Sequence, residues 1–166
     1  MAAFNLSSSI TATSTYSISV TASGGLYVLS GADKNGSVSG NNATVIVNVG
    51  DTLNFVVNAS GHPFFIKTSA TTGTGNQVST PAATNQGTQS GTVSWTPNTA
   101  GTYYYICQYH GSMVGTITVS SATASIAHQI GAIEYKPSTA TAFVTPTFQS
   151  VAKAITGGTP VNYNLT

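Results

Sequence analysis

The sequence predicts an all-β protein in which two sheets pack face to face. Helical periodicity is nearly absent, whereas short β-branched and aromatic runs recur between clusters of Gly, Asn, Ser and Asp. Within the runs, apolar residues alternate with polar ones, as Val45, Val47 and Val49 do. Alternation of this kind is expected when one face of a sheet lies in a core and the other faces water.

Eight strands are expected along the chain, separated by turn residues. In order they cover residues 16–20, 26–30, 44–49, 53–58, 64–68, 92–96, 102–107 and 115–120. Turns are expected at Ser23-Gly24-Gly25, Asn35-Gly36, Gly40-Asn41-Asn42 and Gly50-Asp51, because Gly, Asn and Asp tolerate the backbone angles of tight turns. Trp95 and the inward-facing Tyr103 and Tyr105 are expected in the core.

This pattern divides the chain into three segments. Residues 15–120 form the β-sandwich, with a short N-terminal arm at 1–14 and an extended C-terminal tail at 121–166. The tail has scattered apolar residues and little regular period, so it is expected to pack on its own domain or on neighbouring subunits. His128 within it is expected to be structural or exposed. The polar run 69–90 is too long for a hairpin turn and is expected to be a surface loop.

The 166 residues carry few charges. Charged side chains make up 4% of the chain, the net charge is +1, and arginine is absent. Binding to nucleic acid or to an anionic membrane needs clustered Lys and Arg, so the composition excludes both kinds of partner. Weak electrostatic repulsion between copies favours a homo-oligomer or another multi-copy assembly.

The N-terminal residues show no targeting signal. MAAFNLSSSITATSTYSI has neither a basic region nor the apolar run of about 7–15 residues that a signal peptide contains. No stretch approaches the roughly 18 apolar residues of a membrane span. We therefore expect a chain that is made and folded inside a cell without export.

Four residues carry the donor atoms expected of a metal site: His62, Cys107, His110 and Met113. Cys107 ends an aromatic strand, and His110 and Met113 follow it at spacings of three residues, while His62 precedes another strand. Two imidazoles and one thiolate with a weak axial thioether define a blue-copper site. Three donors from one tight loop and one from an adjacent strand end are expected at the same pole of the sandwich, and copper is the candidate cofactor.

Two other interpretations of these residues remain open. The donor types could be retained in a sandwich that binds no metal, with Cys107 and His62 as packed core groups. A nucleophilic Cys107–His110 pair is less favoured, because an activated nucleophile needs an orienting third group and no carboxylate lies near this loop in the sequence. The chain is accordingly not expected to be an enzyme.

Residues from about 16 to 120 resemble a cupredoxin of the plastocyanin and amicyanin type. The stretches that carry the resemblance are ATVIVNVGDTLNFVVNASGHPF and TAGTYYYICQYHGSMVGTITV. The resemblance implies a Greek-key β-sandwich with His62 and His110 as imidazole ligands, Cys107 as the thiolate and Met113 as the axial ligand. The chain departs from that family at Pro63, where an Asn usually braces the two ligand loops, so different groups are expected around the ligands.

Three segments are also similar to plastocyanin-like domains in structural proteins of marine tailed phages, especially those that infect cyanobacteria. These segments are GHPFFIKT, NQGTQSGTVSWTP and GTYYYICQYHGSMVGTITVS. That resemblance implies a virion component such as a capsid decoration or cement protein. Its partners would be the major capsid protein or neighbouring copies, and its location the virion.

Three functions follow as hypotheses. The first is the virion decoration role. The alternative is a soluble type 1 blue-copper electron carrier that uses His62, Cys107, His110 and Met113. The third is binding of a host surface or glycan, which rests on the length and polarity of the segment 69–90.

Overall fold

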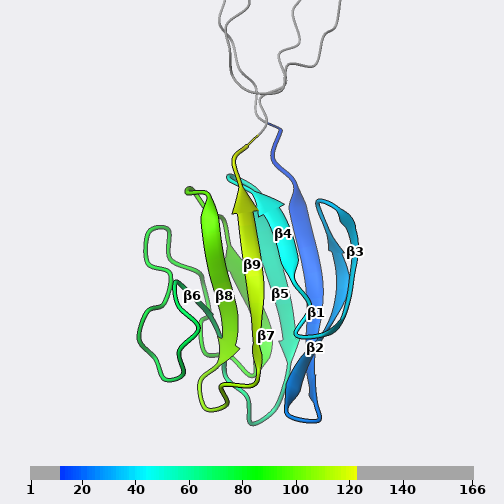
Figure 1. Ribbon diagram of the computed structural model, residues 1–166, viewed down its shortest axis with the longest axis vertical. Coiled ribbons are helices and arrows are strands. Elements are labelled where there is room, and N and C mark those ends of the chain that lie inside the picture. The colour runs from blue at the N-terminus through cyan, green and yellow to red at the C-terminus, as the bar shows by residue number, and fades with distance from the viewer. Residues whose placement is uncertain (1–11, 123–166) are drawn as a thin grey trace, which may run out of the picture. The chain divides into compact units, whose positions relative to one another are not determined.

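The computed structural model describes residues 12–122 of the chain, and these form nine strands (Figure 1). The strands are β1 (Thr15–Ser23), β2 (Leu26–Asp33), β3 (Gly36–Asn41), β4 (Val45–Asn48), β5 (Thr52–Asn58), β6 (Phe64–Lys67), β7 (Ser90–Trp95), β8 (Gly101–Cys107) and β9 (Val114–Ser120). Nearly all of the predicted arm and tail, and His128, lie outside the described residues. In the described part of the chain, no helix is long and apolar enough to cross a membrane.

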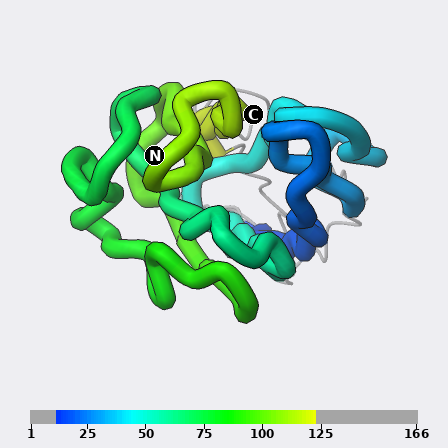
Figure 2. The backbone as a smooth tube through the Cα atoms, turned by 90° about the horizontal axis from the view of Figure 1, so that it is seen from below, coloured from blue at the N-terminus to red at the C-terminus, as the bar shows by residue number. Residues whose placement is uncertain are grey.

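The strands make two sheets that pack as a sandwich. One sheet has the order β3-β2-β1-β5-β7 and the other β4-β9-β8-β6. The chain changes sheet at every connection from β3 to β8, and the pairs β1·β5 and β4·β9 are parallel as a result. Figure 2 views the domain along its long axis, with the blue N-terminal strands to one side and the green and yellow strands to the other. The predicted all-β sandwich is confirmed.

Strand β3 was not predicted, and it is the main correction to the expected elements. Val38 is its only buried residue, and the glycines and asparagines at both ends favour turns. The strand forms because its backbone pairs with β2 across a two-residue connection, from Asp33 opposite Gly36 to Val28 opposite Asn41. Hydrogen bonding to a neighbouring strand therefore outweighs the low β-propensity of GSVSGN.

The core lies between the sheets and follows the predicted alternation. Val45, Val47 and Phe55 are fully buried, and Trp95 is 3% exposed. Tyr103 differs from expectation, because it is only half-buried. Its ring packs edge-on against Trp95 with the ring centroids 4.8 Å apart.

Tyr105 is packed tightly against its cross-strand neighbour. Its side chain is fully buried and its hydroxyl donates to the carbonyl of Ala43 at 2.7 Å. The residue opposite it on β9 is Gly115, and a Cβ atom there would overlap the Tyr105 ring and hydroxyl. A glycine is therefore needed where the ring crosses the strand.

The predicted polar loop connects β6 to β7 and encloses a buried lysine. Lys67 is fully buried, and its ammonium donates to the carbonyls of Thr71 at 2.9 Å and Gly73 at 2.6 Å. The ammonium also lies 5.5 Å from the centroid of the Phe65 ring. Burial lowers the pKa of Lys67, because desolvation disfavours its charged form.

The buried Lys67 makes the free energy of unfolding vary with pH in the alkaline range. Because the pKa of Lys67 is lower in the folded state, this side chain binds more protons in the unfolded state in the interval below its ordinary value of 10.5, and its contribution to the free energy of unfolding rises with pH there. Chemical denaturation at a series of pH values measures this rise. We expect it to disappear in Lys67→Met and to persist in Lys34→Met, whose parent ammonium is half-buried and bonded to Asn48 Oδ1. An unchanged rise in Lys67→Met would contradict the assignment.

Gly115→Ala tests the close packing beneath Tyr105. We expect it to lower the free energy of unfolding by about 2–3 kcal/mol, since the added methyl displaces a buried ring and its hydrogen bond. Gly75→Ala is the control, because a Cβ atom there meets nothing within 4 Å. Equal denaturation midpoints for the two variants would show that the ring moves aside at no cost.

Candidate metal centre

Two connections at one end of the sandwich, together with the end of a strand beside them, carry the four predicted metal-site residues. His62 lies between β5 and β6, and Cys107 is the last residue of β8. His110 and Met113 lie between β8 and β9. Strands β6 and β8 pair with Phe64 opposite Cys107, so the start of one strand lies beside the end of the other. This register brings His62 next to Cys107 although 45 residues separate them.

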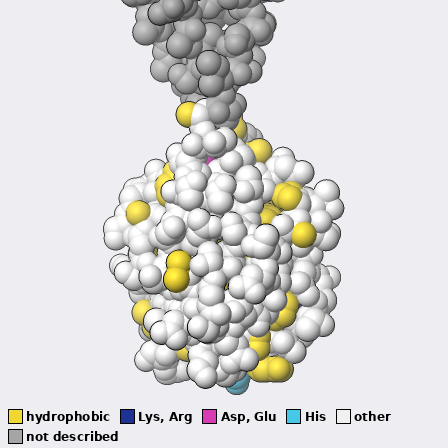
Figure 3. Space-filling view, turned by 180° about the vertical axis from the view of Figure 1, so that it is seen from behind, with side chains coloured by type: hydrophobic (Ala, Val, Ile, Leu, Met, Phe, Trp, Pro, Cys, Tyr) yellow, Lys and Arg dark blue, Asp and Glu magenta, His cyan; other side chains and the backbone are white. Residues whose placement is uncertain are grey.

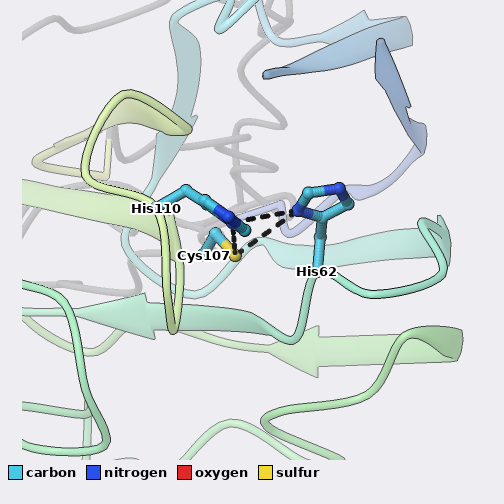
Figure 4. Close-up of side chains that lie close together, drawn as sticks. All are labelled: His62, Cys107 and His110. Carbon is cyan, nitrogen blue, oxygen red and sulfur yellow. Dashed lines mark hydrogen bonds between the residues drawn. The ribbon is translucent and has the colours of Figure 1, made fainter. Parts of the chain in front are cut away.

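The side chains of His62, Cys107 and His110 converge on one another (Figure 4). The two Nδ1 atoms are 3.2 Å apart. The sulfur of Cys107 lies 3.4 Å from Nδ1 of His110 and 3.8 Å from Nδ1 of His62. Cys107 is fully buried, His62 is half-buried and His110 is exposed. The group therefore has a buried sulfur and one ligand edge open to solvent.

These separations fit a single metal ion. An ion bonded to nitrogen at about 2.0 Å and to sulfur at about 2.3 Å in a trigonal plane separates its donor atoms by roughly 3.5–3.7 Å. The three observed separations lie close to that range. One thiolate and two imidazoles are soft and borderline donors, which suit copper in both oxidation states. The residues present thus fit copper.

Met113 lies at the base of the same loop. It is fully buried, its backbone N–H donates to the carbonyl of His110 at 3.1 Å, and its carbonyl accepts from the N–H of Cys107 at 3.0 Å. The first of these bonds closes a four-residue turn over Gly111 and Ser112. The turn makes the loop short enough to keep Cys107, His110 and Met113 at one end of the sheet.

Tyr27 lies beneath the site and was not singled out from the sequence. It is fully buried, and its hydroxyl donates to the carbonyl of His62 at 2.9 Å. Burial raises the pKa of Tyr27, and the adjacent Cys107 raises it further, so the hydroxyl stays protonated and remains a donor. No local spacing signals this contact, because the two residues are 35 positions apart in different strands and loops.

The outer surface at this end is partly apolar. Tyr109 is 62% exposed and its ring lies edge-on to the ring of His110, with the centroids 6.4 Å apart. Figure 3 shows histidine atoms at this tip of the domain, with hydrophobic side chains beside them. A ligand edge is therefore accessible next to an exposed aromatic ring.

Residues 26–120 match the model of a family described as copper binding proteins, plastocyanin/azurin family. Among solved structures, a structure described as the copper protein rusticyanin is 25% identical, with 64% of this chain and 78% of that chain covered and a TM-score of 0.41. Rusticyanin from Thiobacillus ferrooxidans gives 25% identity, coverages of 64% and 77%, and a TM-score of 0.41. Among curated proteins no match is found.

The predicted role as a virion decoration protein is wrong. The family match covers most of the described domain, and the convergence of His62, Cys107 and His110 supports the blue-copper alternative. Low charge was a weak guide to a multi-copy assembly, because uncharged polar groups hydrate the surface of a single domain as well as that of a shell subunit. The virion location and capsid partners depended on that role and have no separate support. The chain belongs to the plastocyanin/azurin family of copper binding proteins.

Proposed function

We propose that this protein is a type 1 copper protein that transfers single electrons. His62, Cys107 and His110 would hold the ion, and Met113 would be its weak axial ligand. The observation that carries the proposal is the convergence of the three donor atoms within 4.8 Å at the end of a hydrogen-bonded pair of strands. Cys107 is held on a paired strand, and the two short loops that carry the other donors begin or end at that pair of strands, which limits their movement.

When bound, copper would supply the one-electron Cu(I)/Cu(II) couple. The chain's own residues do the rest. Burial of Cys107 keeps water from the sulfur, and the turn from His110 to Met113 holds those two residues close to it in the chain. The exposed edge of His110, beside Tyr109, is the point at which a redox partner can approach the centre most closely.

The described carboxylates support electron transfer over nucleophilic catalysis by Cys107. Asp33 accepts from the backbone of Asn35 and Ile46, and Asp51 accepts from the backbone of Asn48 and Ser14. Both carboxylates therefore have structural roles, and within residues 12–122 neither orients a histidine beside the thiol. Binding of a host-surface ligand by segment 69–90 stays a prediction.

Copper addition is the direct test. Cu(II) added to the purified protein should give an intense blue thiolate-to-copper absorption band at one equivalent. Cys107→Ser should abolish the band, because it removes the thiolate that donates the charge. A wild-type protein that stays colourless while circular dichroism shows an intact fold would refute the proposal.

Met113→Leu distinguishes an axial ligand from a residue that only fills the core. Leucine keeps the buried volume but lacks the thioether, so we expect the blue band to persist and the reduction potential to rise, since a donor to Cu(II) is lost. Protein-film voltammetry measures the potential. A potential equal to that of the wild type would assign Met113 to packing alone.

A further inference from the structure

The two loops that carry the predicted ligands must keep a fixed relative position for their donor atoms to converge. Next to β6 and β8, a hydrogen bond between backbone groups joins these loops. We call residues 59–63 the first ligand loop and residues 108–113 the second. On the side of β6 and β8, the N–H of Gln108 donates to the carbonyl of Pro63 at 3.0 Å. Pro63 has no N–H and no polar side chain, so its residue type adds no further hydrogen bond at this junction.

From the other sheet, Tyr27 of β2 contacts the first ligand loop. Its ring packs edge-on against Phe64, with the centroids 5.2 Å apart, and this packing fixes the direction of the hydroxyl. The hydroxyl donates to the carbonyl of His62 at 2.9 Å. The bond restrains the peptide plane of His62, and through it the direction in which the imidazole leaves the backbone.

Asn42 connects Tyr27 to the second ligand loop. Its backbone N–H donates to the Tyr27 carbonyl at 2.7 Å, and its side-chain Oδ1 accepts from the Tyr27 N–H at 3.1 Å. Its Nδ2 then donates to the carbonyl of Ser112 at 2.8 Å, within the turn that joins His110 to Met113. Asn42 has a left-handed backbone with φ +46°, which asparagine tolerates better than most residues.

We propose that Tyr27 and Asn42 are positioning residues of the copper centre, acting as a clamp that holds the His62 peptide and the Ser112 turn in a fixed relation. This inference rests on the proposed function of the site. Groups that orient metal ligands from outside the coordination sphere typically change metal affinity about 10–100-fold when they are removed. Copper affinity and the spectrum of the centre should therefore depend on both residues.

A matched pair of tyrosines separates positioning from simple stability. Tyr27 and Tyr105 are both fully buried, both pack against Phe64, and each donates its hydroxyl to one backbone carbonyl. The acceptor is His62 for Tyr27 but Ala43, outside both ligand loops, for Tyr105. Replacement by phenylalanine removes the same atom from each.

The experiment compares Tyr27→Phe and Tyr105→Phe in the full-length protein. Both variants should unfold at lower denaturant concentration in the metal-free form. In competition with a chelator, Tyr27→Phe should bind copper about 10-fold more weakly than the wild type and shift the thiolate-to-copper band, whereas Tyr105→Phe should match the wild type in both. Equal copper affinity and equal spectra in the two variants would overturn the role of Tyr27.

A second pair tests the other half of the clamp. Asn42→Gly places a residue that tolerates a left-handed backbone at this position, but it removes the side-chain hydrogen bonds to Tyr27 and Ser112. Asn85→Gly is its control, because Asn85 is also left-handed, with φ +55°, and its amide donates to the carbonyl of Thr92. We expect faster release of copper to the chelator from Asn42→Gly only. Equal release rates would overturn the role of Asn42.

The wild-type protein separates the two possible failures. If it gives no blue band, the proposed function is wrong and the clamp falls with it. If the wild type binds copper but Tyr27→Phe and Asn42→Gly behave like their controls, the copper function stands and only the clamp is wrong.

Discussion

The antiparallel pairing of β6 with β8 is the constraint on which the metal centre depends. It places Phe64 opposite Cys107, and it thereby brings the loop that contains His62 against the loop that contains His110. A shift of one residue in this register would exchange the two faces of the strand and direct the Cys107 side chain away from its present neighbours. The chemistry of the site is thus set by a backbone register. All four residues of β6 and the last three of β8 are buried, so this paired end of the sheet is enclosed in the core.

The hydrophobic core continues directly into the site. Phe64 follows the first ligand loop and packs against Phe55, Tyr27 and Tyr105, with ring centroids 4.9 to 5.6 Å apart. Buried rings of this size have few alternative positions, because interiors are packed as densely as organic crystals. The hydroxyl of Tyr27 therefore lies on a rigid support when it bonds to His62. The packing of Tyr27 on Phe64 therefore also supports the hydrogen bond to the first ligand loop.

Charge has a small role in this domain, and polar groups are satisfied mainly by the backbone. Lys67 bonds to two carbonyls, while Asp33 and Asp51 accept from backbone N–H groups. Within residues 12–122, Asp33, Asp51 and Lys67 thus organise loops and turns. This explains why composition was a poor guide to function: low charge is compatible with a shell subunit, but it is equally compatible with a copper-binding sandwich whose few described charges bond to the backbone.

The sequence by itself determined the fold class, eight of the nine strands in the described residues, and the positions of His62, Cys107 and His110, whose donor atoms converge. The role of Met113 as an axial ligand stays a prediction. The alternation within strands and the Cys107-x2-His110-x2-Met113 spacing are local properties. They can be recognised from residues that are close in the chain, whatever the rest of the sequence is. Only the structure decided that β3 forms, because GSVSGN buries a single residue and its backbone depends on pairing with β2. Only the tertiary structure decided that Tyr27 and Asn42 contact the ligand loops, since their partners lie 35 and 70 residues away. No pattern within one strand or turn records such a partner, because hydrogen bonds between distant segments exist only after the sheets have packed.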